Sequence, residues 1–117
     1  MIQKYSFNGE DFKAVMQFEG WKIGLLRYSE RFSKFDRLER HLLSDEAFIL
    51  LEGSATLYTD SEKADMKPLT VYNIPAGIWH HIVVSEHASV LVIENRNTSK
   101  ENTEKKLLQK QSEGGKT

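Results

Sequence analysis

Short apolar segments separated by turn residues constrain the fold of this chain more than any other feature. They recur about every ten residues from Trp21 to Glu94, with Gly53, the Pro75–Gly77 turn and the polar Glu86–Ala88 turn between them. The segments expected to form strands are 21–28, 39–41, 46–52, 54–59, 69–74, 78–85 and 89–94. Short strands repeated at this spacing predict an all-β barrel or sandwich.

The chain changes character after residue 97. A length of 117 residues predicts one domain, and we expect residues 1–97 to form its β-barrel. Residues 98–117 are polar and rich in helix formers, with Thr98 or Ser99 as a helix cap and Glu101 three residues after Thr98. We therefore expect a C-terminal tail that is either a short helix or disordered.

Composition and charge exclude several classes of partner and cofactor. The formal net charge is −1, which gives no electrostatic basis for binding nucleic acid. The chain has no cysteine, so disulfides, thiolate metal sites and cysteine nucleophiles are ruled out. We find neither a secretory signal pattern at the N-terminus nor an apolar run of membrane-spanning length. We therefore expect a cytoplasmic protein whose ligand is a small molecule, with no nucleic-acid or membrane partner.

Four residues form the leading hypothesis for a functional site: Glu39, His41, Glu46 and His80. Glu39 and His41 are two residues apart on one expected strand and so project to the same side. Glu46 begins the next apolar run, and His80 follows the Pro75–Gly77 turn. A sheet that brings these strands together gathers imidazole and carboxylate groups in one cavity. These groups are ligands of divalent transition metals.

The spacing within these stretches resembles the cupin superfamily. The first motif of that family is Gly-x5-His-x-His-x3–4-Glu-x6-Gly, and His41-x4-Glu46-x6-Gly53 matches its second half. The second motif is Gly-x5-Pro-x-Gly-x2-His-x3-Asn, and Pro75-x-Gly77-x2-His80 matches its core. The resemblance covers residues 39–84 and implies a single cupin jelly-roll barrel.

The chain departs from the family at four motif positions. Glu39 stands where the family has its first histidine, Ser33 and Leu69 stand at the leading glycines, and Val84 replaces the final asparagine. Cupins usually hold their metal with three histidines and one glutamate. The resemblance therefore implies a divalent metal (Fe, Mn, Ni, Zn or Co) with the ligands His41, Glu46 and His80. Glu39 is then either a fourth ligand or the catalytic group that moves a proton.

Several functions remain open for such a barrel. With a metal, it would act on a small polar metabolite as a dioxygenase, an isomerase or a lyase. Without turnover, the same pocket would be a small-molecule-binding module, with or without a metal. In a metal-free pocket, Lys22, Arg27 or Arg37 from a neighbouring strand would have to neutralise the buried carboxylates. A third possibility is a metal-free fold that serves dimerisation or partner binding.

The central strands are apolar on both faces. In the 46–52 segment one face carries Phe48 and Leu50, and the other carries Ile49 and Leu51. The outer face must therefore be covered by the second sheet, the N-terminal segment or a partner subunit, and we predict a homodimer. The apolar residues of 11–19 fit neither the helical nor the strand period, so this segment is either a short strand or a helical turn.

Overall fold

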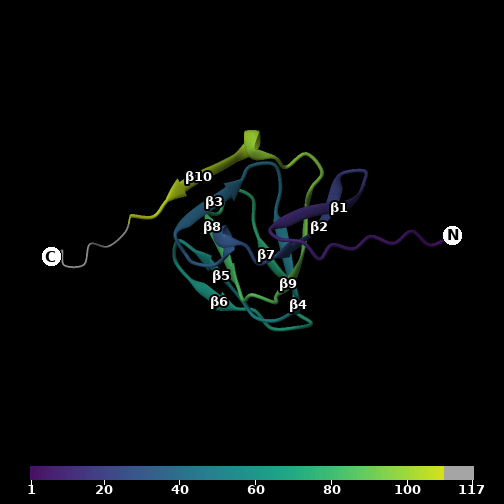
Figure 1. Ribbon diagram of the computed structural model, residues 1–117. Helices are drawn as coiled ribbons and strands as arrows, with labels where there is room; N and C mark the ends of the chain where they lie inside the picture. The colour runs from purple at the N-terminus through teal and green to yellow at the C-terminus, as the bar shows by residue number, and fades with distance from the viewer. Residues whose placement is uncertain (110–117) are drawn as a thin grey trace.

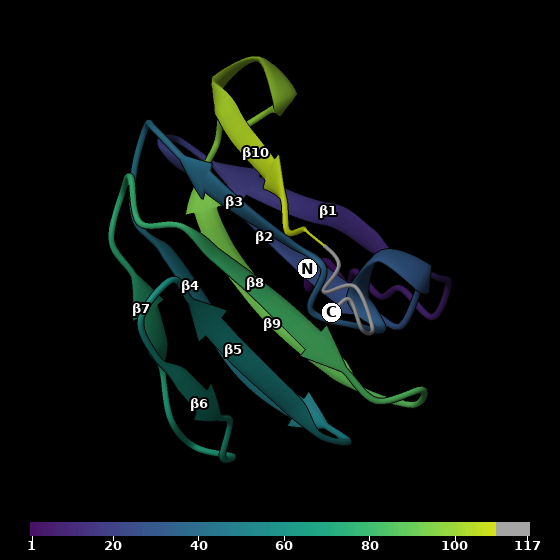
Figure 2. The same ribbon diagram turned by 90° about the vertical axis from the view of Figure 1, so that its left-hand side faces the viewer.

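The computed structural model describes residues 1–109, which form strands in two layers (Figures 1 and 2). Two single-turn 3-10 helices, η1 (Glu30–Phe32) and η2 (Lys100–Asn102), lie in the connections. The strands are β1 (Phe12–Phe18), β2 (Trp21–Arg27), β3 (Arg37–His41), β4 (Glu46–Glu52), β5 (Ala55–Thr59), β6 (Lys63–Asp65), β7 (Tyr72–Ile74), β8 (His80–Val84), β9 (Ser89–Asn95) and β10 (Thr103–Leu107). The predicted all-β class is confirmed. Nowhere in residues 1–109 is there a helix with the length and hydrophobicity needed to traverse a bilayer.

Two five-stranded antiparallel sheets enclose the core. The sheet that we call the β9 sheet has the order β1-β2-β9-β4-β7, and the β8 sheet has the order β10-β3-β8-β5-β6. The β9 sheet contributes Phe48, Val90 and Val92 to one buried cluster, and the β8 sheet contributes Leu57 and Ile82. The two sheets share no strand pairing, so the molecule is a jelly roll that does not close into a continuous barrel.

The ambiguous segment at the N-terminal end is strand β1. It pairs antiparallel with β2, and the register shifts between Ala14 and Met16. A bulge adds one residue and reverses the alternation of side chains beyond it. This shift explains why the apolar residues of β1 do not follow a single period in the sequence.

The segment after residue 97 differs from the predicted short helix or disordered tail. Ser99 and Asn102 do form a capping box, but the helix that follows is the single turn η2. Residues Thr103–Leu107 then form β10, which pairs antiparallel with β3 along its length. Pairing with an open sheet edge satisfies the backbone of β10 and overrides the helical preference of its lysines and glutamate. The part of the predicted tail in 110–117 lies outside the described residues.

Candidate metal centre

The candidate ligand residues of both sequence motifs lie together between the two sheets. His41 is the last residue of β3, Glu46 is the first residue of β4, and His80 is the first residue of β8. In the β3–β8 pairing Glu39 lies directly opposite His80, so both side chains project from the same face of the β8 sheet. Glu46 comes from the facing β9 sheet. The cluster therefore joins the two layers of the fold.

The Pro75–Gly77 turn places His80 beside this cluster. The amide of Gly77 donates to the carbonyl oxygen of His41 at 2.9 Å, which fixes the turn against the end of β3. The φ angle of Gly77 is 83°, a left-handed conformation that glycine adopts without strain. Asp45 also holds the turn, because its carboxylate accepts hydrogen bonds from the Ala76 amide and the Asn73 side chain, each at 3.0 Å.

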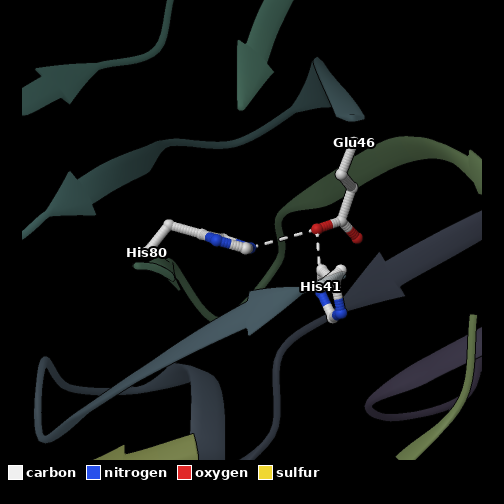
Figure 3. Close-up of side chains that lie close together, drawn as sticks. All are labelled: His41, Glu46 and His80. Atoms are coloured by element: carbon white, nitrogen blue, oxygen red, sulfur yellow. Dashed lines mark hydrogen bonds and ion pairs between the residues drawn. The ribbon is translucent and has the colours of Figure 1, made fainter. Parts of the chain in front are cut away.

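His41 and His80 converge on one oxygen of Glu46 (Figure 3). The Nε2 atoms of both histidines lie 3.0 Å from Oε1 of Glu46. Nδ1 of His80 lies 3.0 Å from the carbonyl oxygen of Ile78, and Nδ1 of His41 lies 2.8 Å from Oγ1 of Thr103. A carbonyl oxygen only accepts, so Nδ1 of His80 carries the hydrogen of that bond. These outer hydrogen bonds orient both rings with Nε2 toward Glu46.

The same contacts shift the acidity of the cluster. Burial acts to raise the pKa of Glu46, but the hydrogen bonds from His41 and His80 outweigh it and lower that pKa from 4.5 to about 2. Burial acts to lower the pKa of His41, and its hydrogen bond with Glu46 outweighs this and raises the pKa above 6.5. The cluster thus holds a carboxylate that stays ionised beside a histidine that readily binds a cation or a proton.

These donor atoms fit a divalent transition metal. The ligand atoms of His41, Glu46 and His80 all lie within 4.8 Å of one another. Metal–nitrogen and metal–oxygen bonds of about 2.1 Å place neighbouring ligand atoms about 3 Å apart, which is close to the two distances observed here. Two imidazoles and one carboxylate match the ligand preference of such ions.

Glu39 lies outside this group of three but lines the same cavity. In the β10–β3 pairing it lies opposite Lys105, which also lines the cavity. Cross-strand neighbours of opposite charge attract each other. Glu39 therefore lies between His80 on β8 and Lys105 on β10 in the strand pairing.

Glu94 and Lys22 are two further polar residues of the cavity. Ladder pairing aligns Lys22 of β2 with Glu94 of β9, and Nζ of Lys22 lies 3.6 Å from Oε2 of Glu94. Burial raises the pKa of Glu94, and the charge of the neighbouring Glu46 and a hydrogen bond with it raise that pKa further, to about 7. The sequence indicates Lys22 only as one of three possible counter-charges for a metal-free pocket, and Glu94 is not among the predicted site residues. The signal that could have identified Glu94 is its position on the same strand face as the buried Val90 and Val92.

The cavity that contains these groups has a volume of about 400 Å³. Its apolar wall comes from both sheets and from η1, with Phe12, Leu26, Phe32, Phe48, Ile82 and Val92. A mostly apolar cavity with a few converging polar groups is typical of a small-molecule site.

Solved structures resemble this chain, whereas no protein-family model and no curated protein matches its sequence. A cupin-2 domain protein from Shewanella frigidimarina superposes with a TM-score of 0.65 at 22% identity, over 77% of this chain and 85% of that one. A cupin superfamily protein from Desulfitobacterium hafniense gives a TM-score of 0.59 at 21% identity, over 76% and 83%. This chain has the cupin fold.

Cupin-fold enzymes are also among the similar structures. A uridine complex of PAC13 from Streptomyces gives a TM-score of 0.65 at 12% identity, over 92% of this chain and 93% of that one. Pac13 is described as a nucleoside dehydratase. DMSP lyase DddQ from Ruegeria pomeroyi gives a TM-score of 0.56 at 13% identity, over 68% of this chain and 40% of that one. At these identities the likeness concerns the fold.

Proposed function

We propose that this cupin-fold chain binds one divalent transition metal at His41, Glu46 and His80 and acts on a small polar metabolite. The observation that carries the proposal is the convergence of two imidazole Nε2 atoms on one carboxylate oxygen at the cavity. Iron, manganese, nickel, zinc and cobalt all accept this ligand set, so the metal is proposed as a class.

A metal at this place supplies Lewis-acid polarisation of a substrate oxygen. The groups of the chain itself then bind the substrate, exclude water and move a proton. Glu39 is the proposed proton carrier, because it lines the cavity without belonging to the group of three. Among dioxygenase, isomerase and lyase chemistry we favour the lyase type. Pac13 is described as a dehydratase and DddQ as a lyase, and both names denote elimination.

The alternative is a small-molecule-binding module without turnover. One observation favours it: both histidines already lie within hydrogen-bond distance of Oε1 of Glu46, so this buried carboxylate has polar partners without an ion. In that case the apolar cavity and its charged groups would serve binding alone.

Metal content tests the proposed site, because the proposed enzyme requires a metal there and the binding module does not. Protein purified without chelator is expected to carry about one transition-metal ion per chain, and His41→Ala and His80→Ala are each expected to lose it. His87→Ala is the matched control, because His87 is exposed in a turn and belongs to no cluster in residues 1–109. A wild-type protein that binds none of the five metals on titration would refute the metal proposal and leave the binding module.

Glu39→Gln tests the role of the carboxylate that departs from the family motif. If Glu39 moves a proton, the variant keeps its metal and loses turnover. If Glu39 is a fourth ligand, the variant binds metal more weakly. Metal content measured by elemental analysis separates these outcomes without a known substrate.

We also propose that the protein is a homodimer that uses the outer face of the β9 sheet. Strand pairing aligns Ile23 with Ile93 and Leu25 with Leu91 across this face, and β4 continues the second row with Ile49. These five side chains are only half-buried in the single chain. These five side chains carry no charge, and the nearest charge in their rows is Lys13 of the edge strand β1, which is aligned with Leu25. A second copy of the same face is therefore a matching partner for the apolar centre of the rows.

Sedimentation analysis tests the dimer. The wild-type protein is expected at twice the mass of one chain, and Leu91→Lys is expected to shift it to the monomer. Thr56→Lys is the control, because Thr56 is a half-buried strand residue on the β8 sheet. A monomeric wild type at about 100 μM would refute the dimer, since a stable homodimer is associated well below that concentration.

A further inference from the structure

The cavity wall includes edge strands of both sheets. Phe12 lines it from β1, and Thr103 and Lys105 line it from β10. β1 and β10 are the first strands of their sheets and do not pair with each other. Figures 1 and 2 show β10 and β1 on the upper side of their respective layers, with the two strands apart from each other in Figure 1. The residues of these edge strands are therefore placed to contact a molecule that enters between the sheets.

Positive side chains from four separate elements line this cavity. They are Lys22 of β2, Arg31 of η1, Lys100 of η2 and Lys105 of β10. The carboxylates in the lining number three: Glu39, Glu46 and Glu94. Cations thus outnumber carboxylates here, although the whole chain has a net charge of −1. A bound divalent metal would increase the positive charge of the cavity further.

The positive groups differ in how far the chain itself neutralises them. Arg31 forms a two-pronged ion pair with Asp11, with hydrogen bonds of 2.8 and 2.9 Å. Lys22 lies beside Glu94. By contrast, within residues 1–109 no carboxylate is in ion-pair contact with Lys100 or Lys105. Lys105 lies opposite Glu39 in the β10–β3 pairing, but the two side chains are not within ion-pair distance. Both lysines are therefore available to a ligand.

A second observation concerns Lys22 and Thr98 in the same wall. The Lys22 side chain is only 16% exposed, and its ammonium donates to the Thr98 carbonyl oxygen at 2.9 Å. An ammonium has three hydrogens, so the bond to Thr98 and the contact with Glu94 leave one hydrogen unused. The hydroxyl of Thr98 is itself buried and has no hydrogen-bond partner within the described residues. Buried polar groups normally find partners, so this part of the wall lacks an acceptor.

From this arrangement we propose that the ligand of the cavity is a small anion whose carboxylate or phosphate group is bound by Lys100 and Lys105, with Lys22 supporting it. This inference rests on the proposed function in that the other end of the molecule lies at the His41–Glu46–His80 cluster. Anionic oxygens supply the acceptors that these ammonium groups lack. In a partly enclosed cavity the attraction between opposite charges is stronger than in bulk water.

Binding of succinate and of inorganic phosphate tests this proposal. Each is titrated into metal-loaded and chelator-treated protein by calorimetry, with neutral succinamide as the comparison. At least one of the two anions is expected to bind saturably, more weakly at high salt, and succinamide is not expected to bind. A preference for succinate assigns a carboxylate substrate, and a preference for phosphate assigns a phosphorylated one.

Lysine variants locate the binding. Lys100→Gln and Lys105→Gln are each expected to weaken anion binding about fivefold, as the loss of one partly exposed charge contact does. Lys63→Gln is the control, because Lys63 is an exposed lysine of strand β6 that does not line the cavity. No saturable binding of either anion up to about 10 mM, or an equal effect of Lys63→Gln, overturns the inference.

The metal and anion measurements fail independently. If the protein binds metal and neither anion, the proposed metal function stands and the anion site is wrong. If chelator-treated protein binds an anion through Lys105 but takes up no metal, the anion site stands and the metal function is wrong.

Discussion

At the scale of single residues, Leu69 adopts a backbone conformation that is suited to glycine. Its φ angle is 61°, and it stands where the second cupin motif has its leading glycine. A left-handed conformation costs a non-glycine residue roughly 1–2 kcal/mol. The side chain is fully exposed, so it gains nothing from packing in return. The turn at Leu69 therefore has a geometry that glycine would adopt without this strain.

Replacing Leu69 by glycine should stabilise the protein. The relief of strain is offset in part by the greater freedom of glycine in the unfolded chain, so we expect a net gain of about 0.5–1 kcal/mol in the free energy of unfolding. Urea denaturation measures it. Leu69→Ala keeps the Cβ atom and its strain, and should show no such gain. Equal stability of the glycine and alanine variants would contradict the strain argument.

The residues of the site were predictable to different degrees. His41, Glu46 and His80 follow from fixed spacings around Gly53 and the Pro75–Gly77 turn, because such spacings reflect local turn geometry. Glu94 becomes a neighbour of Glu46, and Lys22 a neighbour of Glu94, only through the pairing of β2, β9 and β4. Register between distant strands depends on which buried faces pack together in the folded chain, and the local spacing of residues does not reveal it.

At the scale of elements, β10 shows where local propensity misleads. Its sequence Thr103–Leu107 is charged and helix-favouring, but it adds an edge strand to β3. The indole ring of Trp79, which directly precedes β8, contacts side chains of both β3 and β10. The ammonium of Lys106 lies 4.4 Å from the centre of that ring, and the guanidinium of Arg40 on β3 lies 4.5 Å from it. Contacts of β10 with β3 and with Trp79 thus favour a strand over a helix in Thr103–Leu107.

Trp79→Leu should loosen β10 selectively. Two cation–π contacts of about 0.5–1 kcal/mol each are lost, so stability should fall by about 1–2 kcal/mol and the amides of β10 should exchange faster with solvent. Hydrogen exchange followed by NMR measures both effects. Trp21→Leu is the control, because Trp21 lies on β2 in the other sheet. Unchanged protection of β10 in the Trp79 variant would show that strand pairing alone holds it.

At the scale of the whole molecule, the cluster between the sheets links folding to pH. The lowered pKa of Glu46 contributes stability above pH 4.5 that is lost as pH falls toward about 2. The raised pKa of Glu94 contributes stability below pH 4.5 that is lost as pH rises through about 7. The raised pKa of His41 likewise contributes stability that is present below pH 6.5 and is lost as pH rises above it. Chelator-treated protein should therefore be most stable near pH 5, at about the crossing of these effects.

Glu94→Gln tests this pH profile. The variant cannot ionise at this position, so its stability relative to wild type should rise by about 2–3 kcal/mol between about pH 5 and pH 8. Glu62→Gln, a change at an exposed residue of the β5–β6 connection, should leave the profile unchanged. Parallel pH profiles of stability for Glu94→Gln and wild type would contradict the raised pKa of Glu94.

Bound metal should reverse the slope of stability against pH for the wild-type protein. Metal binding requires histidine nitrogens and a Glu46 carboxylate free of protons, and these become more available as pH rises.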